Sequence, residues 1–430
     1  MRLLNEVEVY LDEGLGEPEL VGILRASFGA GRRLSASSFE YAPSYLQDSR
    51  SYELSPDLPL VPGRQYSGAD TELFGAFADV SPDDWGAALI DAAYADERDP
   101  EQPRAIGAFD HLVQLNDVSR VGAIRLKHAG EWLTNAAHSE PRVVDARRLA
   151  EAAARFEIYE ATAEDLELLG VAGSSLGGAR PKANVRREDG SLWILKLPSN
   201  RDRRVEIEAW EAVALDIAGE AGLDVPQLEL IRLESLGSSL LVKRFDRVDA
   251  RRVGYVSALS AMSLGSQGRA TYADFADTVD SLTGSRADLR ELFGRIALTL
   301  LVRNLDDHWK NHGFVRVGSS WRLSPLFDVN PTRAGVKVQA RPINDDDNPL
   351  DRDIRLLTAD HKIYGLTERE AAQMLARVVD AVKRWREFAS RRGISAAEVE
   401  HMSSAFDERQ REHAEAYIAR HIESEGGVGG

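Results

Sequence analysis

The order of hydrophobic patterns between residues 173 and 245 limits the fold of this chain more than any other feature. A glycine-rich turn comes first, then an apolar run typical of a strand, then a helical pattern and two more strand patterns; these segments are 173–178, 192–197, 205–221, 227–233 and 239–245. Gly222 and the turn at 224–226 end the helical pattern. Beyond about residue 255 the periodicity is mainly helical, with a strand-like break at 313–323. We therefore expect a β-rich lobe followed by a helical lobe.

The first part of the chain has the short alternating patterns of a β-rich subdomain. Residues 7–11 and 20–24 alternate apolar and polar side chains, with turns between them. Short helices are expected over 70–120 and a strand at 121–126. A helical region over 142–169 has an expected apolar face of Val144, Leu149, Ala152, Phe156 and Ile158. We predict an α+β chain with a β-rich subdomain (1–135), a lobe with the glycine-rich turn (136–249) and a mainly helical lobe (250–430).

Composition excludes several classes of protein. The 430 residues exceed the length at which one hydrophobic core stops growing, and no apolar run approaches the roughly 18 residues of a membrane span. The N-terminus has no signal-peptide pattern, so a cytoplasmic location is expected. Because there is no cysteine, disulfides and cysteine nucleophiles are excluded. The net charge of −17 argues against direct binding to nucleic acid and favours a basic protein partner.

Asp306 and Asn311, which are five residues apart, give the strongest indication of chemistry. A protein-kinase catalytic loop has the same spacing: its aspartate accepts the proton of the attacking hydroxyl, and its asparagine binds magnesium. Asp307 is the rival base, but it lies only four residues before Asn311. We therefore predict Asp306 as the catalytic base, with an ordinary solvated loop as the alternative.

A further acidic side chain, Asp328, lies 17 residues after Asn311. It follows Phe327 and a strand-like run, where a kinase has its second magnesium-binding aspartate. Carboxylate and amide oxygens are the ligands that magnesium prefers. Asn311 and Asp328 are therefore predicted to share one metal site, although a helix cap would also account for Asp328.

Lys196 stands inside an otherwise apolar strand pattern, where an unpaired ammonium group would be costly. A phosphate would satisfy it, and so would Glu211, which lies fifteen residues further on in the next helix. Glu206 and Glu208 are alternative partners, and a lysine that reaches water from an edge strand is a further possibility.

The glycine-rich turn offers backbone N–H groups to phosphate oxygens, with Arg180 and Lys182 beside it. It matches neither the Walker A pattern nor G-x-G-x-x-G. Its position just before the Lys196 strand is therefore the argument for a phosphate-binding loop.

In this order the motifs resemble the HipA family, the kinase toxins of bacterial HipBA-type toxin–antitoxin pairs. The resemblance covers nearly the whole chain and rests on 7–11, 21–24, Ser175-Leu-Gly-Gly-Ala-Arg-Pro-Lys182, 194–198, 221–226, Lys243-Arg-Phe-Asp-Arg247, 306–311 and 326–328. It implies a two-lobed protein-kinase-like fold that uses ATP and Mg²⁺ to phosphorylate serine or threonine. It also implies growth arrest and persistence through a substrate such as an aminoacyl-tRNA synthetase. The implied partner is a HipB-like DNA-binding antitoxin, through which alone DNA is bound; no membrane is involved.

The resemblance also assigns roles to residues. It implies that Asp306 is the catalytic base, that Asn311 and Asp328 bind the metal, and that autophosphorylation of Ser175 switches the kinase off. The residues implied to bind ATP are Gly177, Gly178, Ala179, Lys182, Lys196, Lys243, Phe245, His308 and Lys310. The chain departs from the family at 180–181, Asp307 and Lys243, without losing a reacting group.

Three other functions use parts of the same pattern. A small-molecule phosphotransferase would have nearly the same spacing, and an inactive kinase acting as a co-repressor would keep the fold. A hydrolytic metal centre of Asp306, Asp307, His308 and His312 would require neither Lys196 nor the glycine-rich turn. The charged runs 251–252 and 344–348 are interpreted as solvated surface.

Overall fold

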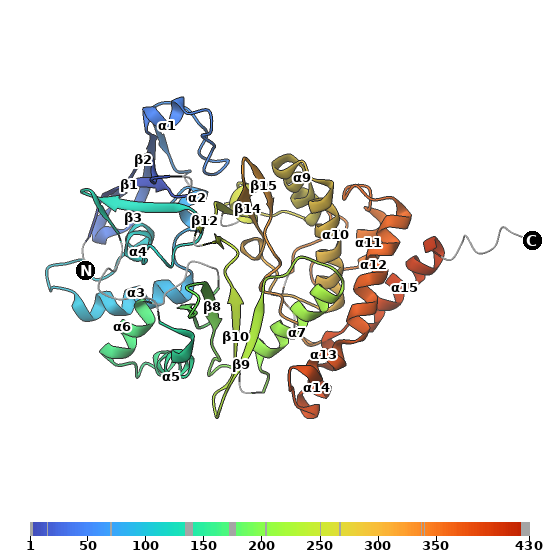
Figure 1. Cartoon of the computed structure of the whole chain (residues 1–430). Coiled ribbons are helices and arrows are strands. Elements are labelled where there is room, and N and C mark those ends of the chain that lie inside the picture. The colour runs from blue at the N-terminus through green and yellow to red at the C-terminus, as the bar shows by residue number, and fades with distance from the viewer. Residues whose placement is uncertain are drawn as a thin grey trace, which may run out of the picture. The chain divides into compact units, whose positions relative to one another are not determined.

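The chain forms two compact units, each built from three separate segments. Unit 1 comprises Met1–Arg201, Ile231–Gly268 and Gly313–Ser319, and unit 2 comprises Asp202–Leu230, Arg269–His312 and Ser320–Gly430. Figure 1 follows the elements along the chain in this computed structural model. The structure describes residues 3–14, 16–68, 71–133, 141–171, 178–202, 204–249, 251–265, 268–336, 338 and 340–422.

An antiparallel sheet forms the first layer of unit 1. Its strands, in the order β4-β3-β2-β1-β5-β6, are Arg64–Tyr66, Leu34–Tyr41, Glu19–Phe28, Glu6–Leu11, Ile124–His128 and Glu131–Trp132. The alternation predicted for the first strand is confirmed, because Val7, Val9 and Leu11 are buried while the residues between them are not. These side chains share a core with the short helices α1 (Pro43–Gln47), α2 (Gly75–Asp79) and α4 (Ala108–Gln114).

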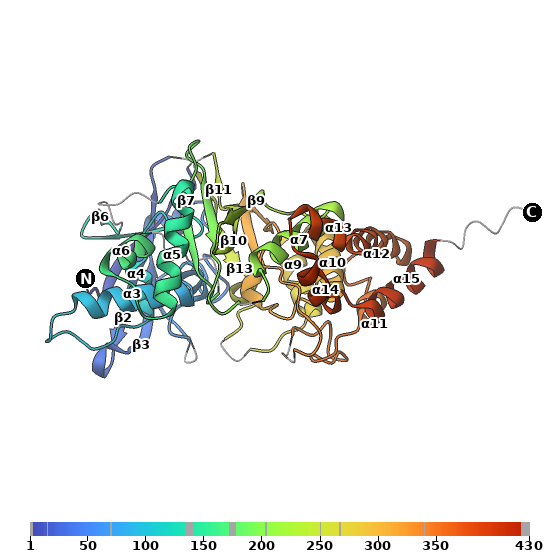
Figure 2. The same ribbon diagram turned by 90° about the horizontal axis from the view of Figure 1, so that it is seen from below.

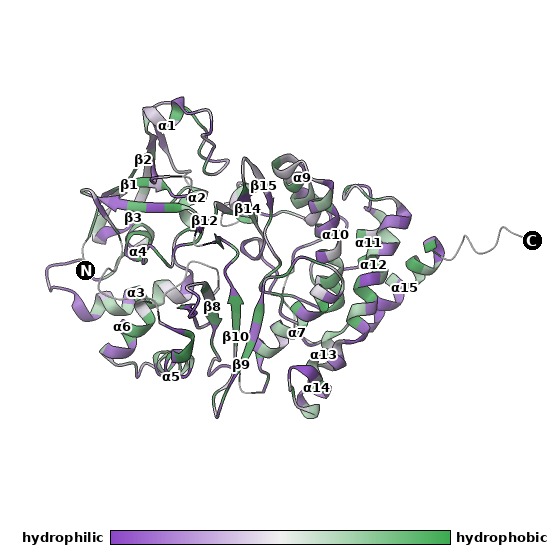
Figure 3. Ribbon diagram, in the orientation of Figure 1, coloured by the Kyte–Doolittle hydropathy of each residue, from purple (hydrophilic) through white to green (hydrophobic). Residues whose placement is uncertain are grey.

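A second sheet, whose strands lie in unit 1 except for the first three residues of β9, carries the predicted phosphate-binding segment. Its strand order is β7-β8-β10-β9, with bounds Lys182–Arg186, Leu192–Lys196, Gly237–Lys243 and Leu228–Leu233. The inner strand β10 is hydrophobic over residues 240–242, part of the green stretch in Figure 3, and its residues 238–242 are buried. Helices α3 (Asp84–Glu97), α5 (Ala146–Glu157) and α6 (Ala163–Val171) complete this part of the unit.

The helical region predicted over 142–169 is two helices, and part of its expected apolar face is wrong. Val144 is 75% exposed because it lies in a 3-10 turn, η2 (Val143–Asp145), before α5 begins. Ile158 is 52% exposed because α5 ends one residue earlier. Leu149 and Ala152 do face the core, together with Ala150 and Ala153.

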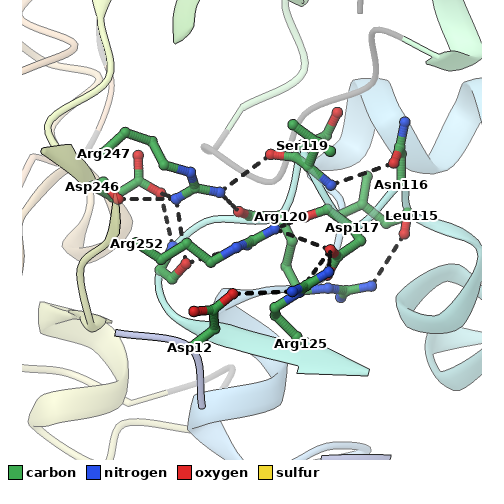
Figure 4. A network of polar contacts seen from close by, with 12 residues as sticks. Asp12, Leu115, Asn116, Asp117, Ser119, Arg120, Arg125, Asp246, Arg247 and Arg252 are labelled. Carbon is green, nitrogen blue, oxygen red and sulfur yellow. Dashed lines mark hydrogen bonds and ion pairs between the residues drawn. The ribbon is translucent and has the colours of Figure 1, made fainter. Parts of the chain in front are cut away.

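A network of arginine and aspartate side chains fixes the segment after β10 within unit 1 (Figure 4). The short strands β11 (Arg247–Val248) and β12 (Arg251–Arg252) pair with each other here. The Arg252 guanidinium lies 3.2 Å from the Asp117 carboxylate and is nearly buried. The interpretation of 251–252 as solvated surface is therefore wrong for Arg252, because its partner lies on a distant part of the chain.

The same unit contains three further short elements. They are η1 (Ala30–Arg32), β13 (Tyr255–Ser257) and α8 (Ala258–Ala261). Strand β13 pairs with β14 (Gly313–Val317), so that Val256 lies opposite Phe314. The predicted strand-like break at 313–323 corresponds to β14 and to β15 (Ser320–Leu323), but β13 was not expected.

Unit 2 is mainly helical, as predicted for most of the last lobe. Its helices are α7 (Ile207–Glu220), α9 (Tyr272–Thr283), α10 (Arg286–Leu301), α11 (Ile354–Ala359), α12 (Glu368–Lys383), α13 (Trp385–Arg391), α14 (Ala396–Met402) and α15 (Glu408–Ile422), with 3-10 turns η3 (Trp309–Asn311) and η4 (Ser403–Ala405). Residues 292–301 of α10 are all buried, which is typical of a helix inside a bundle. Helices α12 and α15 pack side by side in both views (Figures 1 and 2). In the described part of the chain, no helix is long and apolar enough to cross a membrane.

Candidate functional site: the loop after helix α10

The loop that holds Asp306 begins at a sharply turned helix end. Arg303 has a left-handed backbone (φ 49°), and its N–H bonds the carbonyl of Leu300 at 3.2 Å. The N–H of Asn304 bonds the carbonyl of Thr299 at 2.9 Å. These two bonds form a Schellman motif, which satisfies the last carbonyl groups of α10 and directs the chain away from the helix axis.

Within this loop, Asn311 is oriented by the backbone of Asp306. The Asn311 Nδ2 group donates a hydrogen bond to the carbonyl oxygen of Asp306, 2.9 Å away. Asn311 is only 4% exposed, and its Oδ1 atom has no hydrogen-bond partner in the described part of the chain. A buried amide oxygen without a partner is costly unless a donor or a cation satisfies it. The Asp306 side chain itself is exposed.

Asp307 has a different environment from its neighbour. Its carboxylate accepts hydrogen bonds from Tyr272 Oη at 2.5 Å, His312 Nε2 at 3.0 Å and Arg352 Nη1 at 3.1 Å. Burial alone would raise the pKa of Asp307, but the hydrogen bond and charge of His312 and the charge of Arg352 hold it well below the usual value. With its lone pairs used inside the protein, Asp307 anchors the loop and is not available as the base.

The proposed hydrolytic metal centre at this loop is not formed. No group of three histidine, aspartate or glutamate side chains that could hold a metal ion occurs among the residues the structure describes. The physical reason is that Asp307 and His312 bond each other, at 3.0 Å, inside the core. This interpretation of the sequence is therefore wrong.

Asp328 is joined to the same loop through two asparagines. Its Oδ1 accepts a hydrogen bond from Asn330 Nδ2 at 3.4 Å, and the N–H of Asn330 bonds Asn304 Oδ1, also at 3.4 Å. The backbone of Asp328 is left-handed (φ 60°), a conformation that is uncommon outside glycine and frequent at functional sites. The helix-cap interpretation of Asp328 is wrong, since the next described helix begins at Ile354.

These side chains fit a divalent cation. Asn311 Oδ1 and the Asp328 carboxylate are hard oxygen donors of the kind that magnesium prefers, and the amide oxygen has no protein partner among the described residues. His308 and Lys310 lie in the same loop, half-buried and exposed respectively. The loop therefore combines a hard oxygen donor that lacks a described protein partner with an exposed carboxylate, that of Asp306.

In unit 1, two of the lysines assigned to ATP are cross-strand neighbours. Lys196 ends β8, is partly buried, and pairs in register with Lys182 on β7. Directly opposite residues place their side chains on the same face of a sheet. The Lys182 ammonium lies 3.0 Å from the buried carboxylate of Asp83, so this face already contains one counter-ion. Lys182 also donates to the carbonyl of Gly178 at 3.4 Å.

The rest of the glycine-rich turn is only partly described. Ser175 and Gly177 lie outside the described residues. Gly178 has φ 97°, a left-handed value that favours glycine, and Ala179 follows it.

Lys243 and Phe245 flank an arginine that is fixed in the core of unit 1. Arg244 bonds Asn184 Oδ1 at 2.7 Å and Asp246 Oδ2 at 2.7 Å, and it is 2% exposed. Alternation along the chain then leaves Lys243 and Phe245 partly exposed on either side of it. The Arg244 network thus fixes the backbone of both residues.

Some residues that shape these sites were not found from the sequence. They are Asp83, Tyr272, Asn304, Asn330 and Arg352. Each has at least one partner that is distant in the sequence, so local spacing does not reveal its role in the site. Only Asp83 had a local signal, as the N-cap of α3, where its carboxylate accepts a hydrogen bond from the N–H of Gly86 at 2.7 Å.

Two family models match the chain. The model of the HipA N-terminal domain matches residues 16–126, and that of the HipA-like C-terminal domain matches residues 174–386, which include Lys196, Asp306, Asn311 and Asp328. No curated protein matches the chain.

The chain is also similar to two solved structures, of which the first covers nearly its whole length. A chain of the Shewanella oneidensis MR-1 complex of HipA, HipB and operator DNA is 17% identical, with 97% of each chain covered and a TM-score of 0.62. The Helicobacter pylori proinflammatory kinase CtkA is also 17% identical, with 57% of this chain and 93% of that chain covered and a TM-score of 0.44. The predicted fold class, kinase-like with a β-rich N-terminal part, is confirmed. Together the two family models, which match both the N-terminal and the C-terminal part, establish that this chain belongs to the HipA family.

Proposed function

We propose that the chain is an ATP-dependent protein kinase that phosphorylates serine or threonine, and that it is the toxin of a type II toxin–antitoxin pair. One observation carries the proposal: Asn311 is turned by the Asp306 carbonyl so that its Oδ1 is left for a cation, while the Asp306 carboxylate is exposed. A metal ligand beside an exposed base is what phosphoryl transfer to a hydroxyl requires.

In this proposal each residue has one task. Asp306 accepts the proton of the attacking hydroxyl, and Asn311 and Asp328 hold magnesium, which supplies positive charge to the phosphate oxygens. Lys196 contacts phosphate, and so does Lys182, which lies at the end of the glycine-rich turn. Gly177, Gly178 and Ala179 offer backbone N–H groups. Lys243 and Phe245 hold the adenosine part, while His308 and Lys310 contact the phosphates from the loop.

The proposed partners follow from family membership and charge. We propose a HipB-like antitoxin that binds DNA, because the similar solved structure contains HipA, HipB and operator DNA. A basic antitoxin suits a chain with a net charge of −17. The proposed substrate is a cytoplasmic translation component such as an aminoacyl-tRNA synthetase, whose modification arrests growth and favours persistence. Autophosphorylation at Ser175 would switch the kinase off, since a phosphate there repels those of ATP.

A phosphorylation experiment tests the proposal. The purified chain is incubated with host lysate, Mg²⁺ and ATP labelled in the γ-phosphate, beside the Asp306→Asn variant. We expect one or a few labelled proteins with phosphoserine or phosphothreonine in the wild-type sample only. If the label appeared only in small molecules, the chain would be a small-molecule phosphotransferase and the proposal of a protein kinase would be rejected. No label in any fraction, including Ser175, would indicate an inactive kinase.

A further inference from the structure

Unit 2 contains a cavity of about 480 Å³ that the kinase chemistry does not use. Its apolar wall is the stacked pair Trp385 and Phe406, whose ring centroids are 4.1 Å apart with an angle of 6° between the planes. Both rings are almost fully buried, so this wall is rigid. The remaining lining is mostly charged and includes the hydroxyl groups of Ser403 and Ser404.

Most charges around this cavity are already compensated. Four arginines and two acids line it. Glu408 accepts a hydrogen bond from Arg411 Nη2 at 3.0 Å, and Asp407 Oδ1 accepts one from the N–H of Gln410 at 3.1 Å, in the first turn of α15. Arg409 forms an ion pair with Asp351, 2.6 Å away. Two arginines, Arg303 and Arg386, make no hydrogen bond or ion pair with a described residue, although the charge of Asp351, which is paired with Arg409, also acts on Arg303.

Arg303 occupies a position that a glycine would hold more easily. It is the left-handed residue of the Schellman motif that ends α10, where a side chain costs about 1 kcal/mol relative to glycine. Its side chain makes no hydrogen bond or ion pair with any residue that the structure describes, and its Nε atom is buried. A buried guanidinium N–H without an acceptor is unfavourable unless a ligand supplies one.

Arg386 is held in place by an aromatic ring. Its guanidinium carbon lies 4.2 Å from the centroid of the Trp385 ring, a cation–π contact that orients the planar group. In the described part of the chain it has no acidic partner. A stacked guanidinium loses little further freedom when it binds an anion, because its plane is already fixed.

We propose that this cavity is a binding site for a phosphate monoester, held between Arg303 and Arg386. Two guanidinium groups match the doubly charged phosphate, since each can bind two of its oxygens, and the plane of Arg386 is already oriented by Trp385. A phosphodiester of duplex DNA fits less well, because it carries one charge per phosphate and requires an extended basic surface. The cavity is concave, and the chain as a whole is acidic.

The site is connected to the loop after α10 by two routes. Arg303 directly precedes Asn304, whose side chain and backbone hold Asn330 and Arg352. On the other side, Arg409 pairs with Asp351, and the next residue, Arg352, bonds Asp307 at 3.1 Å. A ligand on Arg303 is therefore expected to slow amide hydrogen exchange in 304–311, whether or not the chain is a kinase.

Calorimetric titration of the purified full chain tests the proposal. The probes are a phosphoserine peptide, its unphosphorylated form, AMP, inorganic phosphate and duplex DNA. We expect the phosphopeptide or AMP to bind, and Arg303→Gln and Arg386→Gln each to weaken that binding about tenfold or more. The matched control is Arg420→Gln, which removes an exposed arginine from the same helix α15 as Arg409 and Arg411 but outside the cavity. The two organic probes distinguish a phosphorylated side chain from a nucleotide as the source.

Four outcomes would overturn the proposal. They are no binding of any monoester, equal binding of the unphosphorylated peptide, unchanged affinity in both cavity variants, and preference for DNA with loss of DNA binding in these variants. Because Arg386 is exposed, its substitution keeps the test valid even if Arg303→Gln unfolds.

Discussion

The carboxylate of Glu211 accepts a hydrogen bond from the backbone N–H of Asp328, with 3.0 Å between Oε1 and N. Glu211 lies on α7 and is 2% exposed, whereas the backbone of Asp328 is left-handed. A buried carboxylate therefore fixes the main chain of the proposed metal ligand. The sequence had suggested Glu211 as a partner of Lys196, and that pairing remains a prediction.

Removing this acceptor is expected to affect both stability and activity. Glu211→Ala leaves the partly buried Asp328 N–H without its partner, so the free energy of unfolding should fall by about 1 kcal/mol. Glu211→Gln keeps an oxygen acceptor and should lose less. Urea unfolding and phosphoryl transfer are measured on both variants. If the two substitutions lowered stability and activity equally, the loss could not be attributed to this hydrogen bond.

Asp306→Asn is expected to lower the rate of phosphoryl transfer about 100-fold or more, because the amide cannot accept the hydroxyl proton. Its stability should be close to that of the wild type, since the side chain is exposed. Single-turnover kinetics with labelled ATP and a thermal unfolding curve are the two measurements. Asp307→Asn is the informative neighbour: if Asp307 were the base, this variant would lose activity while remaining folded.

Asp328→Ala is expected to weaken metal binding and abolish phosphoryl transfer, because it removes a carboxylate ligand. Binding of Mn²⁺ in the presence of ATP, followed by electron paramagnetic resonance, gives a readout that is independent of turnover. The matched control is Asp346→Ala, an exposed carboxylate elsewhere in unit 2. Wild-type affinity for Mn²⁺ in Asp328→Ala would reject the assignment.

Because its pKa is lowered in the folded protein, Asp307 is expected to make the chain less stable in acid. Its folded pKa lies below the unfolded value of about 3.9, so its contribution is fully present above that pH and is lost as the pH falls towards the folded pKa. Replacing it by asparagine at neutral pH should cost about 3–5 kcal/mol, since Arg352 loses its buried partner. Unfolding free energies measured between about pH 6 and 3 should fall less steeply for this variant. Parallel pH profiles of variant and wild type would contradict the prediction.

The buried pair of Lys182 and Asp83 allows a double-mutant cycle. Asp83→Asn keeps the helix cap but removes the charge 3.0 Å from the ammonium, and Lys182→Met leaves the carboxylate without that cation. Each single variant should lose about 3–5 kcal/mol, and the double variant less than the sum. If Lys182→Met raised the KM for ATP more than Asp83→Asn does, Lys182 would have a role in phosphate binding besides its structural role as the partner of Asp83.

The parts of the fold with strong local periodicity could be predicted from the sequence. Strands β1 and β8 and helix α7 fall within about two residues of the expected ranges, since alternation and helix-stop signals are local. Strand β13 was missed because it is three residues long and pairs with Val315, sixty residues after Tyr255. Arg252 was interpreted as surface for the same reason, because Asp117 lies 135 positions away.

The candidate site, too, could be predicted from the sequence only in part. The spacing between Asp306 and Asn311 selected this loop, and the loop also contains the Asn311 amide oxygen, which has no hydrogen-bond partner among the described residues. What separates Asp306 from Asp307 is burial, and burial of Asp307 depends on Tyr272 and Arg352, which belong to other segments. Adjacent aspartates have the same chemistry in a sequence and opposite environments in a structure.

The interleaving of the two units limits when the chain can become a folded protein during synthesis. Because the path passes between units after residues 201, 230, 268, 312 and 319, unit 1 is incomplete until β14 has left the ribosome. Unit 2 requires α15 as well. A nascent chain that stalls before these points lacks the partner strand of β13 and the helix packed on α12, and so exposes apolar surface. No single cut releases either unit intact, and a truncated product is therefore expected to be recognised by chaperones and proteases as an unfinished chain.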